Sequence, residues 1–265
     1  MLALDNIRGI VADLDGVVWR AYHPLPGVPD FFQSMNGRIP YAFASNNSSR
    51  TVDEYVEKLN GLGIPAEPHQ IVSSATATAD YLAERYPRGT LMYVIGGPGI
   101  KMALQQKGFV LLNAPGRRPD LVVVGIDRTL TYAKMQLAVT HIRAGAVFIG
   151  TNGDRTFPIP GGYALGAGSI LAAIESATDI TPIVIGKPES PMFEVALQRL
   201  GTAPAATLMI GDRLETDIMG ANRIGMKSAL MLSGIAREAD IMNSDYQPDA
   251  VYENLAALHR AFGEM

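Results

Sequence analysis

The chain contains no cysteine among its 265 residues. Without thiols it can form neither disulfides nor thiolate zinc sites, and it cannot use a cysteine nucleophile. Histidine is also sparse, because the four residues at positions 23, 69, 141 and 259 are scattered and show no ligand spacing. We therefore expect the histidines at or near the surface rather than in a metal centre.

An excess of basic residues is absent as well. The formal net charge is -4 and no run of Lys or Arg occurs, so the chain lacks the usual electrostatic signature of nucleic-acid or membrane-surface binding. Charged residues interrupt the N-terminal segment, so we expect neither a secretory signal nor a membrane span there. We expect a small-molecule partner, no nucleic acid, no membrane and a cytoplasmic location. The interrupting residues are Asp5, Arg8, Asp13 and Asp15.

What is present is an ordinary globular composition, 48% hydrophobic and 18% charged. Short apolar runs alternate with helical stretches, which predicts an α/β fold with a doubly wound, mostly parallel sheet. In such sheets ligands bind outside the carboxyl ends of the strands, so polar strand ends are expected to converge on one pocket. Four apolar runs end in polar residues, at 9–15, 40–45, 182–187 and 206–212.

A long stretch between the second and third runs has a strand and helix pattern of its own. Strands are expected at 91–95, 121–126 and 147–151, and helices at 132–144 and 169–177. This pattern is too long and too structured for a loop. We predict an inserted α/β cap domain at 78–180 and a discontinuous catalytic core formed by residues 1–77 and 181–265.

The first run ends in two carboxylates, Asp13 and Asp15. In an extended segment, residues two positions apart share a face, so both can meet one small substrate. One carboxylate would serve as nucleophile or metal ligand and the other as proton donor. The same pattern also occurs in solvated turns. Trp19 and Tyr22, just downstream, either line the pocket entrance or form a half-buried aromatic pair.

Polar residues also end the second and third runs. Ser45 begins a cluster of hydroxyl and amide side chains that suits the binding of phosphate oxygens, although such clusters also form turns and helix caps. Lys187 stands between Gly186 and Pro188, where its charge could neutralise a phosphate and a nearby carboxylate. An ordinary solvated lysine is the alternative.

Two further carboxylates follow the fourth run, at Asp212 and Asp217. Their spacing of a little over one helical turn lets both face one crevice. Carboxylate oxygens suit a hard cation such as Mg²⁺. Asp217 could instead stabilise the start of a helix through the helix dipole, or serve in both ways.

These four motifs together, in identity and order, resemble the haloacid dehalogenase (HAD) superfamily, and within it the NagD-like and 4-nitrophenylphosphatase-like branch. The resemblance spans nearly the whole chain. It implies a HAD-like core with an α/β cap, and it says little about the substrate. The stretches that support the branch are Ser45–Arg50, Thr151–Asp154, Gly166–Ser169, Ile185–Pro188 and Gly211–Asp217.

The resemblance implies a phosphoric monoester hydrolase that works through an aspartyl-phosphate. Asp13 would attack phosphorus, and Asp15 would protonate the leaving oxygen and then deprotonate the attacking water. A dehalogenase does not need the second aspartate, so Asp15 favours phosphate esters. Mg²⁺ would be held by the Asp13 carboxylate, the Asp15 backbone carbonyl and Asp212, with Asp217 acting through water or by supporting these ligands without touching the ion.

The remaining implied roles concern the substrate. Ser45 and Lys187 would bind the phosphoryl oxygens, and Asn46 and Asn47 would contact substrate or phosphate. The resemblance also allows a homodimer formed through the cap. Phosphoglycolate, sugar phosphates, nucleoside monophosphates and pyridoxal phosphate all stay open as substrates. A member of the same fold that binds metabolites without turnover is the alternative function.

Overall fold

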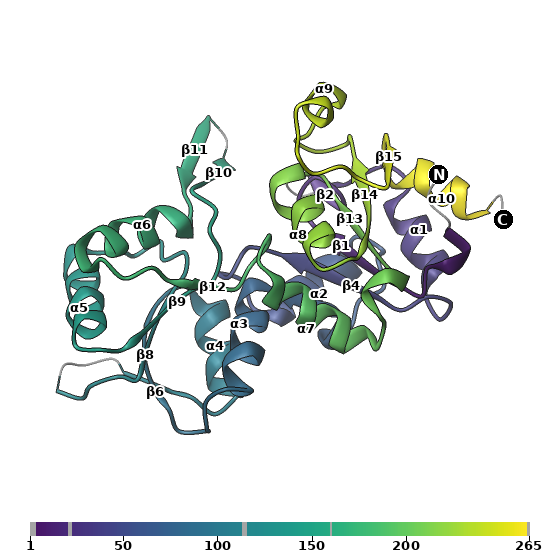
Figure 1. Cartoon of the computed structure of the whole chain (residues 1–265). Coiled ribbons are helices and arrows are strands. Elements are labelled where there is room, and N and C mark those ends of the chain that lie inside the picture. The colour runs from purple at the N-terminus through teal and green to yellow at the C-terminus, as the bar shows by residue number, and fades with distance from the viewer. Residues whose placement is uncertain (1–3, 21–22, 113–115, 160, 264–265) are drawn as a thin grey trace. The chain divides into compact units, whose positions relative to one another are not determined.

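The computed structural model describes residues 4–20, 23–112, 116–159 and 161–263 of the chain. They form two compact units, both drawn in Figure 1. The first unit contains the residues up to 45, residues 53–72 and the residues from 187 onward, and the second contains residues 46–52 and 73–186. The sequence placed its domain boundaries a few residues away, after 77 and after 180. The assignment of the two units as catalytic core and cap stays a prediction.

A six-stranded sheet forms the centre of the first unit, with the strand order β15-β14-β13-β1-β4-β5. The pairs that join β15 through to β4 are all parallel. From β1 the sheet continues to β4 on one side and to β13 on the other, so β1 lies next to the point where the chain order reverses. The strands are β1 (Gly9–Asp13), β4 (Tyr41–Ser45), β5 (Ile71–Ser73), β13 (Thr207–Gly211), β14 (Lys227–Met231) and β15 (Ala250–Tyr252).

Every residue of β1, β4 and β13 is buried. Helices must therefore cover both faces of the sheet, which is why these strands read as continuous apolar runs rather than as alternating patterns. Two of these helices, α1 and α10, also pack against each other, because the ring of Phe31 contacts the rings of His259 and Phe262. The helices of this unit are α1 (Val28–Met35), α2 (Val52–Gly61), α7 (Ser190–Leu200), α8 (Met219–Arg223), α9 (Glu238–Met242) and α10 (Leu255–Gly263).

Several shorter elements complete the first unit. A small hairpin, formed by β2 (Trp19–Arg20) and β3 (His23–Pro24), follows β1. A single π-helical turn, η4 (Leu214–Ile218), lies between β13 and α8 and carries Asp217. The 3-10 turns are η1 (Leu4–Asn6), η2 (Pro68–Gln70) and η3 (Pro204–Ala206).

The second unit has its own parallel sheet of five strands, in the order β12-β9-β8-β6-β7. In Figure 1, α5 and α6 lie on one face of this sheet, and α3 and α4 lie on the other. The strands are β6 (Leu91–Ile95), β7 (Val110–Leu111), β8 (Leu121–Val124), β9 (Val147–Gly150) and β12 (Ile183–Val184), and β10 (Thr156–Ile159) and β11 (Gly162–Leu165) form a hairpin. The helices are α3 (Ser74–Ala83), α4 (Pro98–Gln106), α5 (Tyr132–Arg143) and α6 (Ala167–Thr178).

The core of the second unit explains why this segment is more than a loop. Ile95, Val122 and Phe148 project from three strands into one apolar cluster, where Ile142 of α5 and Ile174 of α6 also pack. The predicted fold class, an α/β protein with mostly parallel sheets, is confirmed. Every strand and helix predicted inside the inserted stretch is present within a few residues.

One expected core strand is wrong. The apolar run 182–187 forms only the short strand β12, and β12 pairs with β9 at the edge of the second unit's sheet. It does not join the sheet that carries Asp13. A local apolar pattern predicts a strand, but the sheet in which the strand pairs depends on contacts distant in sequence.

Among the described residues, no helix is both long enough and apolar enough to cross a membrane.

Candidate active site

The carboxyl edge of the first unit's sheet gathers most of the predicted site residues. Asp13 is the last residue of β1, and Asp212 directly follows the neighbouring strand β13. Asp13 pairs with Ala44 of β4, so Ser45 lies one residue farther along the adjacent strand. Parallel strands point the same way, which brings all three residues to one edge of the sheet.

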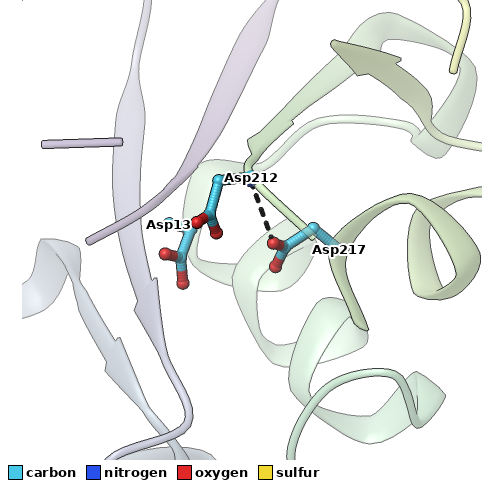
Figure 2. A group of neighbouring side chains, drawn as sticks. All are labelled: Asp13, Asp212 and Asp217. Atoms are coloured by element: carbon cyan, nitrogen blue, oxygen red, sulfur yellow. Dashed lines mark hydrogen bonds between the residues drawn. The ribbon is translucent and has the colours of Figure 1, made fainter. Parts of the chain in front are cut away.

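Three carboxylates meet at this edge. Asp13, Asp212 and Asp217 each offer an oxygen atom, and these atoms lie within 4.8 Å of one another. Figure 2 shows the three side chains together, coming from β1, from the end of β13 and from η4. All three are buried, with exposed fractions of 9%, 1% and 1%. This arrangement supplies hard oxygen ligands of the kind that Mg²⁺ accepts.

Lys187 is the cation of this acidic cluster. Its ammonium donates hydrogen bonds to Oδ1 of Asp13 and to Oδ1 of Asp217, the latter at 2.7 Å. The lysine itself is buried. One ammonium faces three carboxylates, so two negative charges stay uncompensated when all four groups are ionised. Buried charge without a partner is costly, and the cluster therefore favours a bound divalent cation.

The pKa values reflect this imbalance. Burial raises the pKa of Asp13 well above its ordinary value, and the charges of Asp217 and Asp212 act in the same direction while Lys187 opposes them. Burial, with the charge of Asp217, raises the pKa of Asp212 to about 6. Burial alone would lower the pKa of Lys187, but the charges of Asp13 and Asp217 outweigh it and raise the pKa.

The surroundings of Asp212 fit a metal ligand. Its Oδ2 accepts a hydrogen bond from the backbone N–H of Ile235 at 2.9 Å. Its Oδ1 is buried and has no hydrogen-bond partner among the described residues. A buried carboxylate oxygen without a donor needs another electropositive partner. Mg²⁺ would be such a partner.

Two glycines make room for the Asp212 carboxylate. A Cβ atom at either Gly16 or Gly234 would overlap this carboxylate. Gly16 also has a φ of 93°, a conformation that residues with side chains rarely adopt. The backbone therefore closes around Asp212 on two sides.

Asp217 differs from the other two carboxylates because both of its oxygens already accept hydrogen bonds. Oδ2 accepts from the backbone N–H of Asp212 at 3.2 Å and of Arg213 at 3.1 Å, while Oδ1 accepts from Lys187. Asp217 thus shapes the loop after β13 and holds the lysine. Its predicted action on the metal through water stays a prediction.

Asp15 stands apart from the buried cluster. Its side chain is exposed, and its Oδ1 accepts a hydrogen bond from the indole Nε1 of Trp19 at 2.8 Å. Trp19 is fully buried, so it is neither half-buried nor at a pocket entrance. Tyr22, predicted as its partner, lies outside the described residues. The predicted proton transfer by Asp15 stays a prediction.

The predicted phosphate contacts divide between the two units. Ser45 is buried in the first unit, where its Oγ accepts a hydrogen bond from the hydroxyl of Tyr55 at 3.3 Å. Asn46 and Asn47 belong to the second unit. Asn46 donates through Nδ2 to Asp154 at 3.1 Å, and Oδ1 of Asn47 accepts from the backbone N–H of Ser49 at 2.8 Å.

These two contacts give the asparagines a structural role, since they hold the segment that follows β4. Their contact with substrate stays a prediction.

Sequence reasoning missed the segment after β14. Gly234 and Ile235 form part of the Asp212 environment, yet neither was singled out. The available signal was the apolar run of β14, Lys227–Met231, which also ends in a polar and glycine-containing segment. It closely resembles the four runs that were recognised.

The chain was compared with protein-family models and with curated proteins. Residues 10–110 match the model of haloacid dehalogenase-like hydrolases, and residues 184–258 match a second, HAD-hydrolase-like model. A 5'-nucleotidase of Bacillus subtilis, YutF, is 36% identical over 253 residues, which cover 95% of this chain and 97% of the relative. An acid sugar phosphatase of Staphylococcus aureus is 34% identical and covers 95% of this chain and 96% of its own length.

Solved structures show the same similarity. A 4-nitrophenylphosphatase of Thermotoga maritima matches with a TM-score of 0.91 and 32% identity, covering 98% of this chain and 99% of its own. NagD of E. coli matches with a TM-score of 0.87 and 28% identity, covering 94% of this chain and 97% of its own. A glycerol phosphate phosphatase of Mycobacterium tuberculosis, in complex with magnesium, matches with a TM-score of 0.88 and 32% identity, covering 97% and 78%.

The fold and the site define an α/β protein with a buried acidic centre at the carboxyl edge of its first unit's sheet. The comparisons specify it further, and the chain belongs to the haloacid dehalogenase-like hydrolases. The predicted NagD-like branch and the predicted enzyme class, a phosphoric monoester hydrolase, are both confirmed by these relatives.

Proposed function

We propose that this phosphatase hydrolyses small phosphate monoesters in a Mg²⁺-dependent reaction that passes through an aspartyl-phosphate on Asp13. The observation that carries the proposal is the buried cluster of three carboxylates and one lysine at the carboxyl edge of the first unit's sheet. Phosphoryl transfer depends mainly on positioning and on neutralising charge. The cluster holds Asp13 in a fixed position and contains a lysine that can neutralise phosphoryl charge, so it meets both requirements.

Asp13 is the proposed nucleophile. A carboxylate must be ionised to attack phosphorus, and burial works against ionisation here. The hydrogen bond from Lys187 opposes that effect and also fixes Oδ1 in space. The second oxygen of Asp13 would then form the bond to phosphorus. Lys187 thus serves the reaction before any substrate is bound.

Asp15 is the proposed general acid and base. It is two residues from Asp13 and exposed, so a leaving oxygen and later a water molecule can reach it. It would protonate the ester oxygen as that oxygen departs, and it would take a proton from the water that hydrolyses the aspartyl-phosphate.

The residues that would hold Mg²⁺ are the Asp13 carboxylate, the Asp15 backbone carbonyl and Asp212, with Asp217 supporting them through water. The partnerless Oδ1 of Asp212 supports this assignment. When bound, the ion would neutralise charge on the phosphoryl group. The magnesium complex of the related glycerol phosphate phosphatase is in keeping with this choice of metal.

The phosphoryl oxygens would be bound by the Ser45 hydroxyl and by Lys187, with Asn46 and Asn47 as further contacts. The named relatives act on sugar phosphates, nucleotides, glycerol phosphate and 4-nitrophenyl phosphate. These esters share the phosphoryl group and little else. The proposal therefore extends to small phosphate monoesters and to no single substrate.

Hydrolysis of 4-nitrophenyl phosphate tests the proposal. We expect phosphate release that requires Mg²⁺, stops on addition of a chelator and is lost in Asp13→Asn. A folded protein that binds Mg²⁺ but hydrolyses none of a broad panel of phosphate esters would contradict the proposed function. Normal turnover by Asp13→Asn would contradict the assignment of the nucleophile.

A further inference from the structure

The single tryptophan of the chain contacts the proposed proton donor. Nε1 of Trp19 lies 2.8 Å from Oδ1 of Asp15. Trp19 is 1% exposed, whereas Asp15 is exposed. An exposed aspartate ordinarily samples several rotamers because few contacts restrict it. A hydrogen bond from a buried donor limits Asp15 to the orientations in which Oδ1 faces the indole.

The backbone between the two residues holds the indole in place. The N–H of Gly16 donates to the carbonyl of Trp19 at 2.9 Å, and the N–H of Trp19 donates to the carbonyl of Leu14 at 3.1 Å. The hydroxyl of Ser233 fixes the same turn from outside, since it donates to the carbonyl of Gly16 at 2.8 Å. The turn that carries Asp15 therefore also positions the group that orients it.

A second contact fixes the plane of the ring. The ammonium of Lys58 lies 3.5 Å from the centroid of the Trp19 ring. A cation over an indole face is attracted by the π electrons of the ring. Trp19 is thus held by a cation on its face and by a carboxylate at its edge, and all three residues belong to the first unit.

We propose that Trp19 is a positioning residue for proton transfer by Asp15, a role that rests on the function proposed above. The indole nitrogen donates one hydrogen and accepts none. The hydrogen bond therefore occupies Oδ1 and leaves Oδ2 as the oxygen from which a proton can be transferred.

The proton transfer can be written out with its bonds. An oxygen of Asp13 forms the new bond to phosphorus, and the bond between phosphorus and the ester oxygen breaks. The electron pair of the broken bond stays on the ester oxygen, which takes the proton from Oδ2 of Asp15. Asp15 is left as a carboxylate that still accepts the hydrogen bond from Trp19.

The test compares two substrates with different leaving groups. 4-Nitrophenolate departs readily without a proton, whereas the alkoxide of glycerol phosphate needs one. The ratio kcat/KM reports the steps up to departure of the leaving group. In Trp19→Phe, we expect kcat/KM to fall about 10- to 100-fold more on glycerol phosphate than on 4-nitrophenyl phosphate, as part of the effect that a positioned acid supplies. Asp15→Asn should show the same selectivity more strongly.

Two further proteins separate positioning from stability. Replacing tryptophan by 3-benzothienylalanine in a tryptophan auxotroph changes position 19 alone and keeps the ring shape while removing the N–H. It should reproduce the selectivity of Trp19→Phe even if that variant folds poorly. Phe32→Leu is the control, because Phe32 is equally buried and packs on Tyr41 and Phe43. It should change both substrates by the same factor.

The outcomes distinguish this inference from the function on which it rests. Equal losses on both substrates in the benzothienylalanine protein, with a selective loss in Asp15→Asn, would overturn the role of Trp19 and leave the proposed function standing. Equal losses in Asp15→Asn would instead overturn the role of Asp15 and, with it, that of Trp19. A larger loss on glycerol phosphate than on 4-nitrophenyl phosphate, in both the benzothienylalanine protein and Asp15→Asn, would support the inference.

Discussion

Each unit of the molecule contains a lysine paired with aspartate, and the two sites differ in balance. In the second unit, Lys134 donates to Oδ2 of Asp127 at 2.7 Å, while Oδ1 accepts from the backbone N–H and the hydroxyl of Thr129 at 2.8 and 2.7 Å. Both carboxylate oxygens have donors, and one cation meets one anion. In the first unit, Lys187 pairs with Asp13 and Asp217 in a cluster of three carboxylates, and Oδ1 of the third, Asp212, has no donor among the described residues.

The pKa shifts follow the same contrast. Burial works against ionisation of Asp127, but hydrogen bonds from Lys134 and Thr129 outweigh it and lower the pKa of Asp127. For Asp13 burial prevails and the pKa rises, despite Lys187. A satisfied pair of this kind is typical of a structural contact at the start of a helix, here α5. A buried excess of negative charge costs stability and is typical of a functional site.

The largest expected effect is loss of activity in Asp13→Asn. Removal of a nucleophile lowers kcat on the order of 10⁴-fold or more. The same change lowers the excess of negative charge in the cluster, and Asp217 still pairs with Lys187, so the thermal midpoint of the metal-free protein should stay level or rise. Steady-state hydrolysis of 4-nitrophenyl phosphate and thermal unfolding check the two parts. In the matched variant Asp127→Asn, activity should persist while the thermal midpoint falls.

Removing each lysine in turn compares the two sites directly. In Lys187→Met, the buried carboxylates of Asp13 and Asp217 lose the ammonium that pairs with them, and we expect a loss of about 3–5 kcal/mol in the free energy of unfolding at neutral pH. In Lys134→Met the loss should be no more than about 1 kcal/mol, because that lysine is partly solvated. Urea unfolding in the presence of a chelator measures both. Equal losses would show that the two sites do not differ in the way described.

Stability should also depend on pH in opposite directions at the two sites. The pKa of Asp212 is about 6 in the folded protein and near 3.8 in an unfolded chain, so between these values the folded state binds the extra proton. The contribution of Asp212 to the free energy of unfolding therefore falls as pH rises from about 4 to about 6. Relative to wild type, metal-free Asp212→Asn should gain stability over this window.

Asp127 provides the control with the opposite sign. Its pKa is lowered in the folded state, so its stabilising contribution is present above the ordinary value of 3.8 and is lost as pH falls below it. Asp127→Asn should lose stability relative to wild type as pH rises through that value. Denaturant unfolding at several pH values tests both variants. The same sign of change in both would contradict the contrast.

Removal of Mg²⁺ should have the smallest of the expected effects, a change in the thermal midpoint. The proposed Mg²⁺ site exists in the folded state, so Mg²⁺ should raise the thermal midpoint of the wild type by an amount that grows with its concentration. The increase should vanish in Asp212→Asn and persist in Lys134→Met. Thermal scans with Mg²⁺ and with a chelator measure it. An equal increase in Asp212→Asn would place the ion elsewhere.

The local sequence was sufficient to predict part of this site. Asp13, Ser45 and Asp212 each end an apolar run, and a buried parallel strand must be apolar throughout and polar where it emerges. The strands β1, β4 and β13 and the edge at which these residues meet were therefore predictable. The spacing of Asp212 and Asp217 was enough to place both in one crevice.

Other features depend on contacts that no local pattern contains. The run before Lys187 was expected in the core sheet, yet β12 pairs with β9 in the other unit. The approach of Gly234 to Asp212 depends on where β14 lies in the sheet. The hydrogen bond from Trp19 to Asp15 depends on the path of the turn between them. Each requires the folded chain.

The central claim is that Asp13, held by Lys187 in the buried carboxylate cluster, is the nucleophile, and mass spectrometry can test it directly. The protein is mixed with 4-nitrophenyl phosphate and Mg²⁺, quenched in acid during turnover and digested. The account predicts that the peptide containing Asp13 carries one phosphoryl group, and that this label disappears with a chelator and in Asp13→Asn. Turnover with an unlabelled Asp13 peptide and the phosphoryl group on another residue would contradict it.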